Sequence, residues 1–166
     1  SKTVTVNSLT LVDGSNGGLA SNYSISAGQT TTANLSATYS NGTAGVGATL
    51  TASSNGAITM DGVSPVVNDR ILVKDQTAPA QNGIYVVTTQ GDGSTPFVLT
   101  RATPEDQPAE LSGGSFIFVE EGTANGDNGY VFTHTGQPTF GTTALDVTQF
   151  SGAGQITAGA ALTKSG

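Results

Sequence analysis

Short runs rich in valine, isoleucine, threonine and aromatic residues recur about every 10–15 residues, separated by clusters of glycine, asparagine and aspartate. The runs have the length and composition of β-strands, and the clusters contain the residues that favour tight turns. The clearest runs are residues 70–74, 83–88, 97–101, 115–119 and 130–133. This pattern predicts an all-β fold, an antiparallel sandwich or barrel-like module.

Composition divides the 166 residues into three parts. Residues 1–36 contain two or three alternating runs, which are too few to close a core of their own. We expect this N-terminal strand extension to pack on the rest of the chain or on another chain. Residues 37–151 form the predicted main β domain. Residues 152–166 are rich in glycine and alanine, and are interpreted as a linker or as an extended strand donated to a neighbouring subunit.

The alternation within the runs also predicts which side chains form the core, because successive residues of a strand point to opposite faces. The predicted core contains Ile71, Val73, Ile84, Val86, Phe116, Phe118, Val131 and Phe150. On this phase, truncating Phe118 to alanine should cost about 3–5 kcal/mol of stability.

The chain carries few charges, with five Lys and Arg against 12 Asp and Glu and a net charge of −7. The cations are scattered singly, so no basic patch is available to neutralise phosphates, and we expect no nucleic-acid binding. Anionic membrane surfaces are disfavoured for the same reason. No apolar run approaches the roughly 18 residues that a spanning helix needs, so no membrane insertion is expected. Cysteine is absent, which excludes disulfides and thiolate metal sites.

Enzymatic chemistry has few candidate residues. His134 is the one histidine, and no serine lies in a Gly-x-Ser-x-Gly elbow, so we interpret His134 as a surface or strand-edge residue. The carboxylates of Glu105 and Asp106, of Glu120 and Glu121, and of Asp127 have the residue types of a glycosidase site. However, the chain lacks tryptophan and has only four Tyr and six Phe to build sugar platforms. The sequence therefore predicts a protein that is not an enzyme, with acidic loops that are solvated.

Hard oxygen donors cluster between residues 120 and 128. Glu120, Glu121 and Asp127, with Asn125 and Asn128, could supply oxygens to calcium, which takes about six to eight such ligands. Their spacing does not match the regular Asp-x-Asp-x-Asp-Gly loop. A turn that needs glycine and asparagine for backbone reasons explains the same residues, and both interpretations stay open. No other cofactor is expected.

Three separated motifs carry a family resemblance: residues 69–85, which include Asn82-Gly83 as a predicted tight reversal between strands, residues 99–103, and residues 148–154. Together they resemble a β-rich module of bacteriophage tail-fibre proteins, over residues 37–154. Residues 2–11 and 22–25 are similar to the closing strands of repeats in large bacterial surface adhesins.

The resemblance implies a non-enzymatic, extracellular structural and adhesion module, part of a phage tail fibre or appendage, that mediates assembly and attachment to a host surface. The expected location is the virion tail or the cell surface. The expected partners are further copies, in an oligomer or filament, and a cell-surface glycan or protein receptor. One alternative is a bacterial surface adhesin or self-assembling extracellular filament subunit. Another is a glycan-degrading fibre enzyme.

Overall fold

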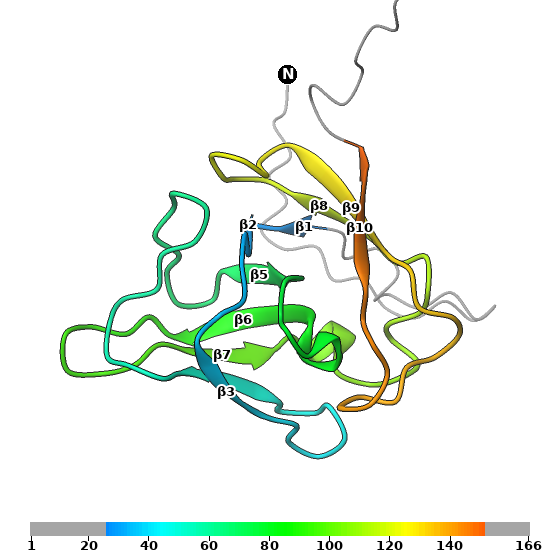
Figure 1. Cartoon of the computed structure of the whole chain (residues 1–166), viewed down its shortest axis with the longest axis horizontal. Helices are drawn as coiled ribbons and strands as arrows, with labels where there is room; N and C mark the ends of the chain where they lie inside the picture. The colour runs from blue at the N-terminus through cyan, green and yellow to red at the C-terminus, as the bar shows by residue number, and fades with distance from the viewer. Residues whose placement is uncertain (1–25, 152–166) are drawn as a thin grey trace, which may run out of the picture.

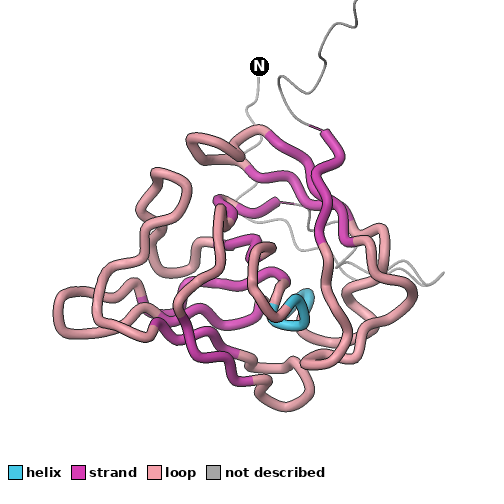
Figure 2. Tube along the Cα trace, viewed as in Figure 1, coloured by secondary structure: helices cyan, strands magenta, loops and turns pink. Residues whose placement is uncertain are grey.

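The computed structural model describes residues 26–151, which form an all-β, sandwich-like arrangement of two sheets (Figures 1 and 2). The four-stranded sheet has the order β1 (Ser26–Ala27), β8 (Phe116–Val119), β9 (Asn128–Phe132) and β10 (Val147–Ser151). The six-stranded sheet has the order β2 (Gln29–Thr30), β5 (Arg70–Val73), β6 (Gly83–Thr89), β7 (Val98–Arg101), β4 (Thr49–Ala52) and β3 (Ala37–Ser40). Two short 3-10 helices, η2 (Pro79–Gln81) and η3 (Thr103–Glu105), lie in the connections. The all-β prediction is therefore confirmed.

Both sheets are mixed, whereas the sequence predicted antiparallel pairing throughout. β1 runs parallel to β8 and β2 runs parallel to β5, while the other strand pairs are antiparallel. Only Gly28 separates β1 from β2, so the chain passes from one sheet directly into the other. Residues 26–30 thus pack on the rest of the chain. The strands expected in residues 1–25 and the tail at residues 152–166 lie outside the described residues.

In the six-stranded sheet, β5 and the first half of β6 are buried on both faces, which explains why these strands read as nearly continuous apolar runs. In β5, Leu72 faces the four-stranded sheet, whereas Ile71 and Val73 face the opposite side, and all three are fully buried. The core between the sheets combines Leu72 and Ile84 with residues of β8 and β9. The second core lies on the other face, where loop residues such as Ile58 cover the sheet.

The four-stranded sheet is buried on one face only, and here the predicted phase of β8 is wrong. Ile117 and Val119 are buried, whereas Phe116 and Phe118 are each 37% exposed. All four residues of β8 are apolar, so alternation carried no information about which face turns inward. Pairing with β9, in register Ile117 with Tyr130, sets the phase.

The remaining predicted core residues divide into two groups. Ile71, Val73 and Ile84 are buried, as the alternation indicated. Val86 and Val131 are only half-buried, and Phe150 is 74% exposed, because it lies on the outer face of the edge strand β10. Among residues 26–151, no helix has the length and hydrophobicity needed to cross a bilayer.

Candidate functional site

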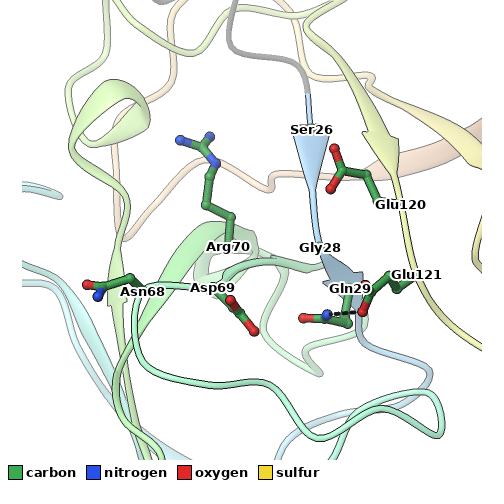
Figure 3. A pocket seen from close by; sticks show the side chains of 8 residues that line it. All are labelled: Ser26, Gly28, Gln29, Asn68, Asp69, Arg70, Glu120 and Glu121. Carbon is green, nitrogen blue, oxygen red and sulfur yellow. Dashed lines mark hydrogen bonds between the residues drawn. The ribbon is translucent and has the colours of Figure 1, made fainter. Parts of the chain in front are cut away.

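A polar pocket of about 290 Å³ lies where the chain crosses between the two sheets (Figure 3). Three segments line it: residues 26–29, 68–70 and 120–121. The first spans β1 to β2, the second leads into β5, and the third follows β8. The pocket is therefore built around the short crossover that the two sheets share.

Backbone hydrogen bonds fix the walls of this pocket. The N–H of Gly28 donates to the carbonyl of Arg70 at 2.8 Å. From the other wall, the N–H of Glu120 donates to Ala27 at 3.0 Å, and that of Glu121 donates to Gly28 at 2.7 Å. Because main-chain bonds hold all three segments, the side chains of Arg70, Glu120 and Glu121 project from a fixed frame.

The residues considered for calcium are not all brought together. Glu120 and Glu121 line the pocket, whereas Asp127 lies in the connection between β8 and β9 and does not. Within residues 26–151, no group of three or more His, Cys, Asp or Glu side chains is placed to hold a metal ion. Calcium binding stays a prediction from the sequence, and the titration proposed below tests it.

Asp61, which sequence reasoning missed, anchors the turn that contains these residues. Its carboxylate accepts hydrogen bonds from the N–H of Ala124 at 3.0 Å and of Asn125 at 2.8 Å. The amide group of Asn125 donates to the same carboxylate at 3.0 Å, while its oxygen accepts from the hydroxyl of Tyr130 at 2.6 Å. The polar residues of the turn thus have a structural explanation, since they satisfy one another and tie two distant loops together.

The acidic loop at residues 105–106 is buried, contrary to the expectation that it would be solvated. Glu105 is 3% exposed and Asp106 is 4% exposed. The guanidinium of Arg70 forms an ion pair with Glu105, with Nη2 and Oε1 2.7 Å apart. This contact draws η3 onto β5, a long-range pairing that no local pattern could reveal.

Burial raises the pKa of the Glu105 carboxyl above its ordinary value, although the charge of Arg70 acts in the opposite direction. The folded state therefore binds this proton more readily than the unfolded state does. Between the ordinary carboxyl pKa, about 4.3, and the raised folded value, the free energy of unfolding should fall as pH rises. Glu105→Gln is uncharged at every pH and should make this slope shallower, as measured by urea unfolding across that range.

Asp127→Asn is the control for this experiment, because it removes the charge of an exposed residue that lies outside the loop at residues 105–106. It should leave the slope of the parent protein unchanged. A slope that is unaffected by Glu105→Gln, or one that becomes steeper, would contradict the assignment to Glu105.

Another arginine, Arg101, connects two of the motifs singled out in the sequence, residues 69–85 and 99–103. Arg101 is 2% exposed, and its guanidinium carbon lies 4.8 Å from the ring centroid of Tyr85 and 4.5 Å from that of Phe140. Its Nη1 donates to the carbonyl of Asn82 at 3.1 Å, and its Nη2 donates to the hydroxyl of Tyr85 at 3.0 Å. These motif residues pack and bind one another inside the fold.

Asn82-Gly83 serves this cluster and does not form the tight reversal that the sequence predicted. Asn82 ends η2, and Gly83 begins β6 with φ of +141°. A Cβ at Gly83 would overlap Nη1 of Arg101, so glycine is needed for the close approach as well as for the backbone angle. The side chain of Asn82 accepts from the N–H of Gln76 at 3.0 Å and donates to the carbonyl of Leu145 at 3.1 Å.

His134 has no nucleophile or acid bound to its ring within the described residues. Both ring nitrogens are buried without a hydrogen-bond partner, and the ring centroid lies 6.0 Å from that of Phe132. A triad base would need hydrogen bonds to a serine and to a carboxylate. His134 instead packs beside an aromatic ring just after β9.

Three phenylalanines that the sequence predicted to be in the core form an exposed aromatic face instead. The rings of Phe116 and Phe150 meet edge to face with centroids 6.0 Å apart, and Phe118 lies two residues along β8. Half-buried Val131 pairs with Phe116 across the two strands. Phe116, Phe118, Val131 and Phe150 are called the outer aromatic face below.

Comparison with protein-family models, curated proteins and solved structures finds no match to this chain. Function is therefore inferred from the pocket and the outer aromatic face. Of the pocket residues, sequence reasoning found Glu120 and Glu121 but missed Gln29 and Asp69. No spacing signal relates those two residues, because they come from segments about 40 positions apart that meet only through the pairing of β2 with β5.

Proposed function

We propose that this chain is a non-enzymatic, extracellular structural and adhesion module, of the kind found in phage tail fibres and related appendages, that assembles with further copies through its outer aromatic face. The observation that carries the proposal is the exposure of this face: Phe150 is 74% exposed, and Phe116 and Phe118 are each 37% exposed. Contiguous exposed aromatic side chains are characteristic of interaction surfaces.

The position of the face in the fold supports the same proposal. It lies on the four-stranded sheet, whose edge strands are β1 and β10. A module in a fibre must connect to its neighbours, and a sheet with an apolar outer face offers a packing surface for that contact. In a fibre, repetition of each contact multiplies weak affinities through avidity.

The alternative of a bacterial surface adhesin or filament subunit shares this assembly mechanism and differs in the organism that owns the protein. The residues that favour it, 2–11 and 22–25, lie outside the described residues. A glycan-degrading enzyme is less well supported, because Glu105 is paired with Arg70 and buried beside Asp106. Neither carboxyl is placed as a free acid or base at an open surface.

Solution mass tests the proposal. By light scattering at micromolar concentration, the full chain should have a mass at least twice that of the 16.5 kDa monomer. Phe150→Ser should shift the mass toward that of the monomer, because it replaces the most exposed ring of the face by a small polar group. Val46→Ser is the matched control, since Val46 is 46% exposed but lies in a turn outside this face. A monomeric parent protein, or equal masses for the two variants, would contradict assembly through this face.

Deletion of residues 152–166 separates face packing from strand donation. Suppose that the deletion abolishes assembly, that the β signal in circular dichroism persists, and that Phe150→Ser has no effect on the mass. In that case the tail provides the contact between copies and the outer aromatic face does not. If the deleted chain assembles like the parent protein and Phe150→Ser does not, the tail is a linker and the face is the interface.

A further inference from the structure

The pocket at the sheet crossover carries an unbalanced negative charge. Asp69, Glu120 and Glu121 line it, and among the described residues that line it Arg70 alone is cationic. The charge of Arg70 is already paired with Glu105 at 2.7 Å. The pocket therefore presents three carboxylates without a cation of their own, and an occupant of positive charge would be attracted to it.

A buried acceptor in the same pocket lacks a donor. Gln29 is 3% exposed, and its Nε2 donates to Glu121 at 3.0 Å. Its side-chain oxygen has no hydrogen-bond partner in the part of the chain that the structure describes. In Figure 3 this oxygen points away from Glu121, toward Asp69, whose carboxylate is also an acceptor. The carboxylate of Asp69 already accepts from the N–H of Val66 at 2.8 Å, whereas the buried oxygen of Gln29 is left to be satisfied by a donor in the pocket.

The arrangement of the carboxylates distinguishes an organic cation from a metal ion. No three acidic side chains in the described part of the chain converge on one point where a metal could bind. The acceptors of the pocket are instead distributed over walls from three segments, around about 290 Å³. A guanidinium group suits such a site, because it spreads five N–H donors over a plane and delocalises one charge.

From these observations we propose that the pocket binds a guanidinium group, with Glu120, Asp69 and the oxygen of Gln29 as acceptors. The inference is independent of assembly through the outer aromatic face. Two sources of guanidinium are possible: a free guanidino compound and an arginine side chain of a partner protein. A second copy of this chain is not the expected source, because its two arginines, Arg70 and Arg101, are both held by internal contacts.

The test is a pair of titrations followed by amide chemical shifts of the full chain at constant ionic strength. Ethylguanidinium should give saturable shifts at Gly28, Gln29 and Glu121, with a dissociation constant of millimolar order. Ethylurea has nearly the same planar shape but no charge, and it should bind at least about tenfold more weakly, since charge-assisted hydrogen bonds are the strong ones. Equal binding of the two probes, or shifts that do not saturate, would overturn the proposal.

A matched pair of variants locates the site. Glu120 is exposed, and its carboxylate forms no hydrogen bond with residues 26–151, so Glu120→Gln should leave the fold intact and weaken ethylguanidinium binding about fivefold or more. Asp127→Asn makes the same charge change outside the pocket, in a residue whose φ of 61° asparagine tolerates. It should bind like the parent protein. An equal loss in both variants would mean that only the net charge attracts the probe, which contradicts a specific site.

Two further titrants address the nature of the ligand. N-acetyl-arginine-N-methylamide presents the guanidinium as a protein would, and tighter binding than that of ethylguanidinium would indicate a partner's side chain, whereas equal binding would indicate a free guanidino compound. Calcium chloride tests the metal interpretation of Glu120 and Glu121. If calcium binds more tightly and displaces ethylguanidinium, the pocket is a metal site and the proposal is wrong.

Discussion

Arg101→Ala should lower the free energy of unfolding by about 3–5 kcal/mol, because it leaves a cavity and unsatisfied hydrogen-bond partners in place of a buried side chain. The carbonyl of Asn82 would lose its donor, and the rings of Tyr85 and Phe140 would border a cavity. The charge of Arg101 also lowers the pKa of the Asp106 carboxyl, which burial and the charge of Glu110 raise. Urea unfolding at pH 7 measures the loss directly.

Arg101→Lys separates the shape of the guanidinium from its charge. Lysine keeps the charge but not the planar fork that reaches both Asn82 and Tyr85, so a loss of about 1.5–3 kcal/mol is expected. A variant with lysine as stable as the parent protein would show that the fork is unimportant.

Gly83→Ala completes a double-mutant cycle with Arg101→Ala. Alone it is destabilising, because the added Cβ overlaps Nη1 of Arg101 and φ at this position is +141°. In the background of Arg101→Ala the overlap disappears and only the backbone strain remains. The loss of stability in the double variant should therefore be smaller than the sum of the two single losses by about 1 kcal/mol or more. Strict additivity would mean that Gly83 is needed for its backbone angle alone.

Ile117→Ala and Phe118→Ala should differ in stability by several kcal/mol, with the smaller side chain giving the larger loss. Ile117 is 1% exposed in the core between the sheets, so its truncation should cost about 2–5 kcal/mol. Phe118 is 37% exposed on the outer aromatic face, and its truncation should cost about 1 kcal/mol or less. Denaturant unfolding is measured at low protein concentration, where self-association contributes least.

This pair of variants decides the phase of β8. A loss of about 3–5 kcal/mol for Phe118→Ala, with Ile117→Ala nearly neutral, would restore the phase expected from the sequence. It would also remove the basis for assembly through the outer aromatic face, because Phe116 and Phe150 would then belong to a core. Phe132→Ala, in a fully buried residue of β9, is the positive control for a core truncation.

Two of the motifs singled out in the sequence, residues 69–85 and 99–103, have a structural role in this chain. Tyr85 and Arg101 lie directly opposite each other on β6 and β7, and Asn82 and Gly83 accommodate the guanidinium between them. Arg70, from the same stretch, pairs with Glu105. These residues hold the six-stranded sheet and its loops together, while others from the same motifs, Asp69 and Phe150, lie in the pocket and on the outer aromatic face.

Local pattern alone was enough to predict where strands occur. Runs of β-branched and aromatic residues between turn clusters marked β5 to β9 to within a few residues, because strand propensity and turn chemistry act over short distances. The same pattern gave the all-β class. The alternation of apolar residues also predicted burial correctly for Ile71, Val73 and Ile84, which lie in central strands of the six-stranded sheet.

Tertiary structure decided what depends on contacts between distant segments. The uniformly apolar β8 could adopt either phase until its register with β9 turned Ile117 inward and left Phe118 outside. Glu105 is buried because Arg70, 35 positions earlier, pairs with it. The pocket formed only when residues 26–29 joined both sheets and brought Gln29 beside Glu121. Sequence patterns report propensity and periodicity, whereas phase, ion pairing and cavities depend on which strands pair, and long-range packing determines that pairing.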